Sequence, residues 1–158
     1  MSNETSNILE LRTATASDLP LIQQWLSESG LPTEDIPQIL DCLYLGIDQE
    51  AVVGIGGIER HGKDGLLRSL VIVPPFRQQG YGRLLCRQLI NQAKTEEMQA
   101  LYLLTNTADQ FFAQLGFERI ARPAAPATMQ RTTEFSSLCP DSAICMRLYL
   151  RQSEQSHP

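Results

Sequence analysis

Residues 70–83, which read LVIVPPFRQQGYGR, decide the fold. The first four residues end an apolar run typical of a buried strand, and the two prolines that follow stop that strand. An amphipathic pattern then begins at the two glycines and continues to Thr95, which predicts a helix over residues 80–95. The segment therefore combines a strand, a loop and a helix in close succession.

The junction of loop and helix has the composition of a diphosphate site. The first N–H groups of a helix have no partner within it and carry a partial positive charge. Gly80 and Gly82 place no side chain in front of those amides, and Arg77 and Arg83 can add charge-assisted hydrogen bonds. The sequence contains neither a P-loop motif nor a Rossmann fingerprint. Glycines that only form a turn are an alternative that these residues leave open.

The remaining patterns predict an α/β protein with a mixed sheet. The helix over residues 80–95 provides a crossover that makes part of the sheet parallel. We expect strands at residues 8–13, 42–47, 51–58, 66–73, 100–104, 117–120 and 143–150. We expect further helices that begin near Asp18, Thr33, Asn106 or Thr107, and Ala125. Residues 8–150 are expected to form a single domain, with residues 1–7 and 151–158 as flexible tails.

Composition excludes several classes of function. The chain has 158 residues, of which 42% are hydrophobic and 20% charged, and a net charge of −5 argues against nucleic acid as a partner. No apolar run approaches the roughly 20 residues needed to cross a membrane, and the polar N-terminus predicts a cytoplasmic protein. The four cysteines show no C-x-x-C spacing, so we expect no metal site. The acid-free basic stretch between Asp64 and Glu96 suits an anionic ligand or is a solvated helix face.

Two motifs carry a resemblance to a known family. R-Q-Q-G-Y-G at residues 77–82 resembles the [QR]-x-x-G-x-[GA] signature of GNAT acetyltransferases, and F-F-A-Q-L-G-F at residues 111–117 resembles a later segment of the same family. The resemblance covers residues 8–150. It implies the GNAT fold, with the central mixed sheet splayed between the fourth and fifth strands and helices on both faces. It also implies an enzyme that moves an acetyl group from acetyl-CoA to an amine.

The resemblance assigns acetyl-CoA to particular residues. The diphosphate would lie on the amides of residues 78–83, and the pantetheine arm along the backbone of residues 71–73. A strand amide there would stabilise the oxyanion. The implied contacts are Val71, Ile72, Val73, Arg77, Gln78, Gln79, Gly80, Tyr81, Gly82, Arg83, Asn106 and Phe112.

The sequence departs from the family where catalysis is concerned. Many members have a tyrosine that protonates the leaving thiolate, and the matching position here is Phe112. Many also have a glutamate base early in the central strand, whereas Arg68 and Ser69 are the polar residues of that stretch here. The catalytic candidates are therefore Glu59, Arg68 and Glu134, with His61 as a further candidate base. Arg68 either binds a substrate carboxylate or forms a salt bridge.

Because a base is not obvious, we expect a substrate amine of lowered pKa, such as the α-amine of an amino-acid-like molecule, attacking directly in a ternary complex. An amine with a pKa near 8 is neutral in about a tenth of molecules at pH 7, against about one in 2,500 for a lysine side chain. Segments such as L-R-S-L at residues 67–70 resemble the GNAT subgroup associated with bacterial arsenic-resistance clusters. This resemblance adds arsenical amines to the expected acceptors. The alternatives are a non-catalytic acyl-CoA sensor and a protein N-terminal acetyltransferase, in each case as a monomer or a homodimer.

Overall fold

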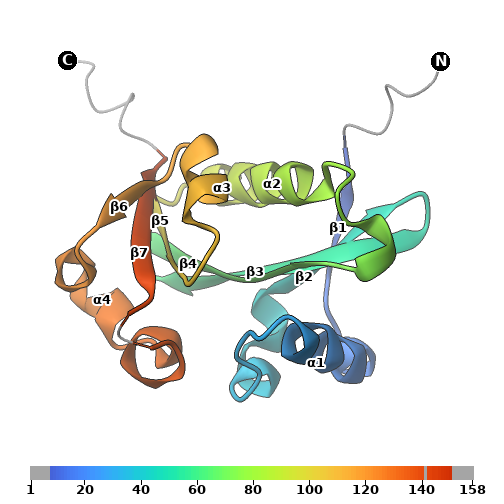
Figure 1. The fold of residues 1–158 in the computed structure, drawn as a ribbon, viewed down its shortest axis with the longest axis horizontal. Coiled ribbons are helices and arrows are strands. Elements are labelled where there is room, and N and C mark those ends of the chain that lie inside the picture. Colours follow the sequence, from blue (N-terminus) through green and yellow to red (C-terminus); the bar gives the residue numbers. More distant parts are fainter. Residues whose placement is uncertain (1–7, 141, 151–158) are drawn as a thin grey trace. The chain divides into compact units, whose positions relative to one another are not determined.

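The computed structural model describes residues 8–140 and 142–150. Within them, seven strands form one sheet in the order β1-β2-β3-β4-β5-β7-β6 (Figure 1). The strands are β1 (Glu10–Thr13), β2 (Leu43–Asp48), β3 (Ala51–His61), β4 (Asp64–Ile72), β5 (Ala100–Thr105), β6 (Glu118–Ile120) and β7 (Ile144–Tyr149). The helices are α1 (Leu19–Glu28), α2 (Tyr81–Thr95), α3 (Asp109–Gln114) and α4 (Ala127–Gln130), with short 3-10 turns between several elements. The predicted mixed α/β sheet is confirmed.

The pairing of β4 with β5 is parallel and short. It joins Asp64–Leu66 to Ala100–Tyr102, although β4 continues to Ile72. The other pairings described beyond β4, β5 with β7 and β7 with β6, are antiparallel. The parallel pair confirms the predicted crossover through α2.

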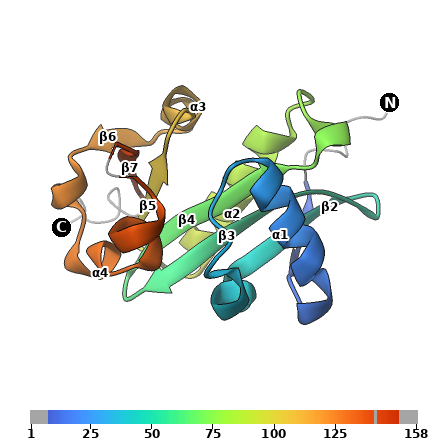
Figure 2. The ribbon, with the colours of Figure 1, turned by 60° about the horizontal axis from the view of Figure 1, so that its bottom comes forward.

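The chain divides into two compact units. The first contains the residues up to Ile58 together with Ser69–Leu89. One face of its strands packs against α1, where Ile22 and Leu26 lie in one cluster with Leu43 and Ile55, all fully buried. The first turns of α2 cover the other face, as Figures 1 and 2 both show.

Glycines let α2 approach that second face closely. A Cβ atom added at Gly54 would lie 3.1 Å from a methyl group of Leu85 and 2.7 Å from the carbonyl oxygen of Val71. A Cβ atom at Gly56 would lie 2.6 Å from Leu89. A Cβ at Gly54 would meet rigid backbone at less than 3.0 Å, so glycine is required there, whereas at Gly56 the flexible side chain of Leu89 would have to move.

The second unit contains Glu59–Arg68 and the residues from Ile90 onward. Leu66, Tyr102, Met129 and Phe135 belong to its buried cluster. The single helix expected from Ala125 is wrong, because α4 ends at Gln130 and a separate π-helical turn spans Glu134–Leu138.

Thr132 provides the physical reason for this break. Its hydroxyl donates to the carbonyl oxygen of Met129 over 2.8 Å and accepts from the N–H of Phe135 over 3.2 Å. A threonine that bonds to nearby backbone groups in this way competes with the regular helical pattern. The helix expected near Asn106 also starts later, at Asp109, after Thr105 accepts the N–H of Ala108.

The expected flexible tails, residues 1–7 and 151–158, lie outside the described residues. In the part of the chain that is described, none of the helices has both the length and the apolar character required to span a membrane.

Candidate active site

The first unit contains the loop that leads into α2. After β4 a 3-10 turn spans Pro74–Phe76, and the backbone then takes left-handed angles at Gln78 (φ 65°) and Gly80 (φ 87°). Glycine adopts this conformation without strain, whereas other residues do so at a cost. The two reversals allow a 15-residue helix to start at Tyr81, with no acidic residue in its first turn. Its N-terminal amides are therefore suited to an anion.

Side chains of the loop are tied to the loop itself. The Nε of Arg77 donates to the carbonyl oxygen of Ile72 over 2.8 Å, and the amide of Gln79 donates to the carbonyl oxygen of Pro75 over 3.0 Å. These bonds fix the path from the end of β4 to the start of α2. Arg77 thus has a positioning role that its motif did not reveal.

Tyr81 links the start of α2 to the turn between β2 and β3. Its hydroxyl donates to a carboxylate oxygen of Asp48 over 2.6 Å, and this hydrogen bond, followed by burial, raises the pKa of Tyr81. No local sequence pattern could predict this contact, because the two residues are 33 positions apart.

The backbone groups at the end of β4 point in different directions. The N–H of Val73 donates to the carbonyl oxygen of Val53 over 2.8 Å, so this group is directed toward β3. Since backbone groups alternate along a strand, those of Ile72 point to the other edge. Of the three residues that the family resemblance assigned to the pantetheine arm, Ile72 therefore has the N–H of most suitable direction, while its carbonyl oxygen accepts from Arg77.

Ser69 lies within β4 just before this point. It has φ 62° although it is not glycine, and only 7% of its surface is exposed. Non-glycine residues in this region are uncommon, and such strain collects at functional sites.

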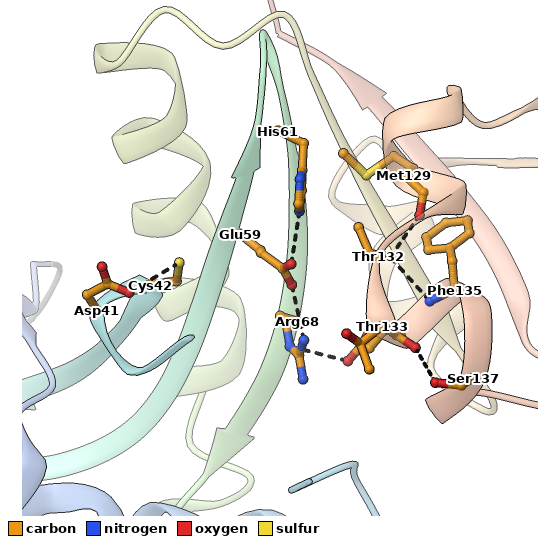
Figure 3. A network of polar contacts seen from close by, with 11 residues as sticks. Asp41, Cys42, Glu59, His61, Arg68, Met129, Thr132, Thr133, Phe135 and Ser137 are labelled. Atoms are coloured by element: carbon orange, nitrogen blue, oxygen red, sulfur yellow. Dashed lines mark hydrogen bonds and ion pairs between the residues drawn. The ribbon is translucent and has the colours of Figure 1, made fainter. Parts of the chain in front are cut away.

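The second unit brings together the three catalytic candidates. Arg68 Nη1 lies 3.1 Å from Glu59 Oε1, and Arg68 Nε lies 3.4 Å from Glu134 Oε2 (Figure 3). On the other side of Glu59, Oε2 lies 2.9 Å from His61 Nε2. We call these four residues, Glu59, His61, Arg68 and Glu134, the carboxylate cluster.

The four side chains of the carboxylate cluster differ in how deeply they are buried. The exposed fraction of the side chain is 0% for Arg68, 6% for Glu134, 13% for Glu59 and 27% for His61. A charge as buried as that of Arg68 is tolerated only when it is paired and hydrogen-bonded. The two carboxylates supply that pairing, so each member fixes the others.

The side chains of the carboxylate cluster come from different strands and turns. Glu59 and His61 are two positions apart on β3 and so face the same side of the strand. Glu134 begins the π-helical turn, and single turns of this kind are frequent at functional sites. Arg122 holds the turn by donating to the carbonyl oxygens of Phe135 and Pro140.

Asn106 and Phe112 also lie in the second unit. Asn106 is exposed between β5 and α3. The ring of Phe112 is 8% exposed and lies edge-on to Phe111 and Phe117, at centroid distances of 5.1 Å and 5.7 Å. Phe112 is therefore an aromatic core residue without a proton to donate.

The thiols of Cys86 and Cys145 are not suited to act as nucleophiles. Burial raises the pKa of Cys86 to about 12, and burial is also the main cause of the raised pKa of Cys145. The thiolate is the reactive form of cysteine, so these two residues are inert at neutral pH.

Comparison with known proteins decides the family. Residues 40–119, half of the chain, match the family model described as the acetyltransferase (GNAT) domain. The chain belongs to the GNAT acetyltransferase family. The predicted GNAT family is thereby confirmed.

Among curated proteins, this GNAT chain is 30% identical over 89 residues to "Uncharacterized N-acetyltransferase CgeE" of Bacillus subtilis. The match covers 53% of this chain and 34% of CgeE.

Solved structures share the fold at low identity. N-acetylglutamate synthase from Neisseria gonorrhoeae, complexed with coenzyme A and N-acetyl-glutamate, gives a TM-score of 0.75 at 18% identity, over 90% of this chain and 35% of the synthase. Rv2747 from Mycobacterium tuberculosis, in complex with CoA and NLQ, gives 0.72 at 22% identity, over 89% of this chain and 99% of Rv2747. The chain thus spans about a third of the length of CgeE and of the synthase, but almost all of Rv2747.

Proposed function

We propose that this GNAT protein transfers the acetyl group of acetyl-CoA to the amine of a small, amino-acid-like molecule by direct attack in a ternary complex. The observation that carries the proposal is the loop into α2, where two left-handed residues open a 15-residue helix without acidic residues in its first turn. In a chain with the GNAT domain, this is the geometry suited to the diphosphate of CoA.

The proposed binding mode uses the first unit from β4 to α2. The diphosphate lies on the amides of residues 78–83, and the backbone of Ile72 receives the pantetheine arm. Arg83 adds positive charge at the start of α2, while Arg77 and Tyr81 hold the loop in place through Ile72 and Asp48. Asn106 and Phe112 remain proposed contacts of the cofactor.

Two observations support an α-amine as the acceptor. The structural neighbours from N. gonorrhoeae and M. tuberculosis were solved with CoA and with N-acetyl-glutamate or NLQ, respectively. An α-amine near pKa 8 also needs little help to lose its proton, whereas a lysine-type amine costs about 4–5 kcal/mol to deprotonate at pH 7.

We assign the proton-accepting role to Glu59. It is more exposed than Glu134, and it follows Ile58 on β3, a strand adjacent to β4 in the sheet. Arg68 is three residues before Val71, so the chain itself keeps their Cα atoms within about 11 Å. Because Arg68 is fully buried between two carboxylates, we assign it a positioning role rather than the binding of a substrate carboxylate.

The state of two of the four thiols supports direct attack by the amine. A covalent acetyl-cysteine route needs an accessible thiolate, and the raised pKa values of Cys86 and Cys145 argue against these two residues. The thiol of CoA is a fair leaving group even without a protonating tyrosine, since thiols have a pKa near 8.5.

We further propose that the acceptors include arsenical amines, in line with the resemblance of residues 67–70 to the arsenic-associated subgroup. We also propose that the reaction takes place in the cytoplasm, since none of the four cysteines, all of which lie in the described residues, forms a disulfide. The protein is proposed to act as a monomer or a homodimer.

The test is an acceptor screen that follows release of the CoA thiol. The panel contains L-glutamate, L-glutamine, L-phenylalanine, an amine-bearing arsenical, Nα-acetyl-lysine and a short peptide with a free N-terminus. We expect the free amino acids or the arsenical to react fastest. A clear preference for Nα-acetyl-lysine contradicts the proposed amine class, and a preference for the peptide identifies a protein N-terminal acetyltransferase.

Phe112 favours a second candidate function, a sensor of acyl-CoA that does not catalyse. The ring has no proton to donate and is packed between Phe111 and Phe117. Tight binding of acetyl-CoA together with no thiol release on any amine of the panel identifies the sensor.

A further inference from the structure

The carboxylate cluster has an ordered path from its most buried member to solvent. Glu59 uses its two carboxylate oxygens separately, with Oε1 on Arg68 and Oε2 on His61. Exposure rises from 0% at Arg68 through 13% at Glu59 to 27% at His61. Figure 3 shows the three side chains in this sequence, with the imidazole at the end away from Arg68.

This arrangement gives Glu59 a way to pass a proton on. The buried guanidinium of Arg68, 3.1 Å from Oε1, holds that oxygen in place, so Oε2 is the oxygen that faces the imidazole. The imidazole, 2.9 Å from Oε2, is the side chain that exchanges protons most readily near neutral pH. It is also the most exposed member of the carboxylate cluster.

We infer that His61 is the proton outlet of Glu59 during acetyl transfer. The inference rests on the proposed function and names the route by which one product of the reaction leaves. The ammonium group of the acceptor loses one proton to Glu59, which passes it to His61 and then to solvent. The free amine attacks the thioester, the C–N bond forms and the C–S bond breaks. The second proton lost by nitrogen ends on the CoA thiol, so the sum is amide, thiol and one released proton.

The charged surroundings of His61 come from four segments. Glu59 lies on its own strand, Arg68 on β4 and Glu134 on the π-helical turn. Lys63 and Asp64 follow it in the chain after Gly62, and burial raises the pKa of Asp64. On β5, burial and the charge of Asp64 raise the pKa of Tyr102.

The experiment compares His61→Gln with wild type. Glutamine can donate to Glu59 but cannot carry a proton between Glu59 and water. Lys63→Gln is the matched control, because this exposed residue lies two positions away in the same turn and outside the carboxylate cluster. For each protein we measure the melting temperature, the KM for acetyl-CoA, and kcat from about pH 6 to about pH 9. The acceptor is the amine of the panel above that reacts fastest with wild type.

We expect His61→Gln to lower kcat about 10-fold or more at neutral pH, with an unchanged KM for acetyl-CoA and an altered pH profile. Added imidazole should restore part of the rate by carrying the proton from Glu59. Lys63→Gln should match wild type in rate, profile and imidazole response. The inference is overturned if His61→Gln keeps the wild-type rate and profile, or if its lost rate follows only a lowered melting temperature and imidazole restores nothing. No turnover by wild type itself is a different result, because it refutes the proposed function as well.

Discussion

The loop into α2 and the carboxylate cluster show two ways in which a sequence builds a site. The loop is made of neighbouring residues, and its bonds run between positions four or five apart, as from Arg77 to Ile72. The cluster joins β3, β4 and the π-helical turn, so that Arg68 meets a partner far along the chain at Glu134. The loop is therefore a local structure that depends on backbone angles, whereas the cluster depends on tertiary packing. Substitutions should separate the two by their effects on stability and on binding.

The largest expected effect is on the stability of the second unit. Arg68→Met leaves Glu59 and Glu134 without their buried cation, and removing one partner of a buried ion pair costs about 3–5 kcal/mol. At about 2–4 °C for each kcal/mol, the melting temperature should fall by roughly 10 °C.

Two further variants control this prediction. The triple variant Glu59→Gln, Arg68→Met and Glu134→Gln removes all three charges and should recover part of the loss. Arg87→Met changes an exposed arginine of α2 and should shift stability by less than about 0.5 kcal/mol. Equal melting temperatures for Arg68→Met and Arg87→Met would show that the buried pairs contribute nothing.

The next effect is on cofactor affinity in the first unit. Gly80→Asp puts a negative charge at the start of α2, where the diphosphate is proposed to bind, so affinity for CoA should fall about 10- to 100-fold. Gly62→Asp is a matched control, because both glycines have positive φ, 87° and 65°, and neither has a neighbour within 4 Å of an added Cβ. The backbone strain is then similar, and calorimetry with CoA should show weaker binding only for Gly80→Asp.

A smaller effect is expected at the link between α2 and the β2–β3 turn. Tyr81→Phe removes the hydrogen bond to Asp48, which should cost about 1 kcal/mol of stability and lower CoA affinity a few-fold. An unchanged CoA affinity in Tyr81→Phe would show that the link does not support the loop.

The same hydrogen bond predicts a pH dependence. Because the pKa of Tyr81 is raised on folding, its contribution is complete below the unfolded value near 10 and is lost as pH rises through the higher folded value. Wild type should therefore lose stability above about pH 10 more steeply than Tyr81→Phe does, as measured by thermal melting across this range. Parallel curves for the two proteins would contradict the role of Asp48.

Most of the fold could be predicted because its signals are local. The alternation of β2 and β3 and the glycines that open α2 gave strands and a helix close to the observed bounds. The long helix expected from Ala125 failed because the hydroxyl of Thr132 bonds to the backbone, which helical periodicity does not reveal. Composition and spacing also indicated the loop residues that we propose bind the diphosphate.

The candidate catalytic residues could be named from the sequence, but their arrangement could not. Glu59 and Glu134 were candidates only because the position of the family's usual glutamate base lacks one, and nothing in a linear pattern pairs both with Arg68. For the same reason, two roles for Arg68 remained open from the sequence alone: binding of a substrate carboxylate, or a salt bridge within the protein. Its complete burial in the folded chain decides for the salt bridges.

The most direct test of the central claim compares two ligands of the same protein. Coenzyme A and pantetheine share the thiol arm, and only CoA has the diphosphate that the amides of residues 78–83 are proposed to bind. By calorimetry, the account predicts that CoA binds and that pantetheine binds at least about 100-fold more weakly, since charge-assisted hydrogen bonds supply the difference. Equal affinity for the two ligands, or no heat with either, would contradict it.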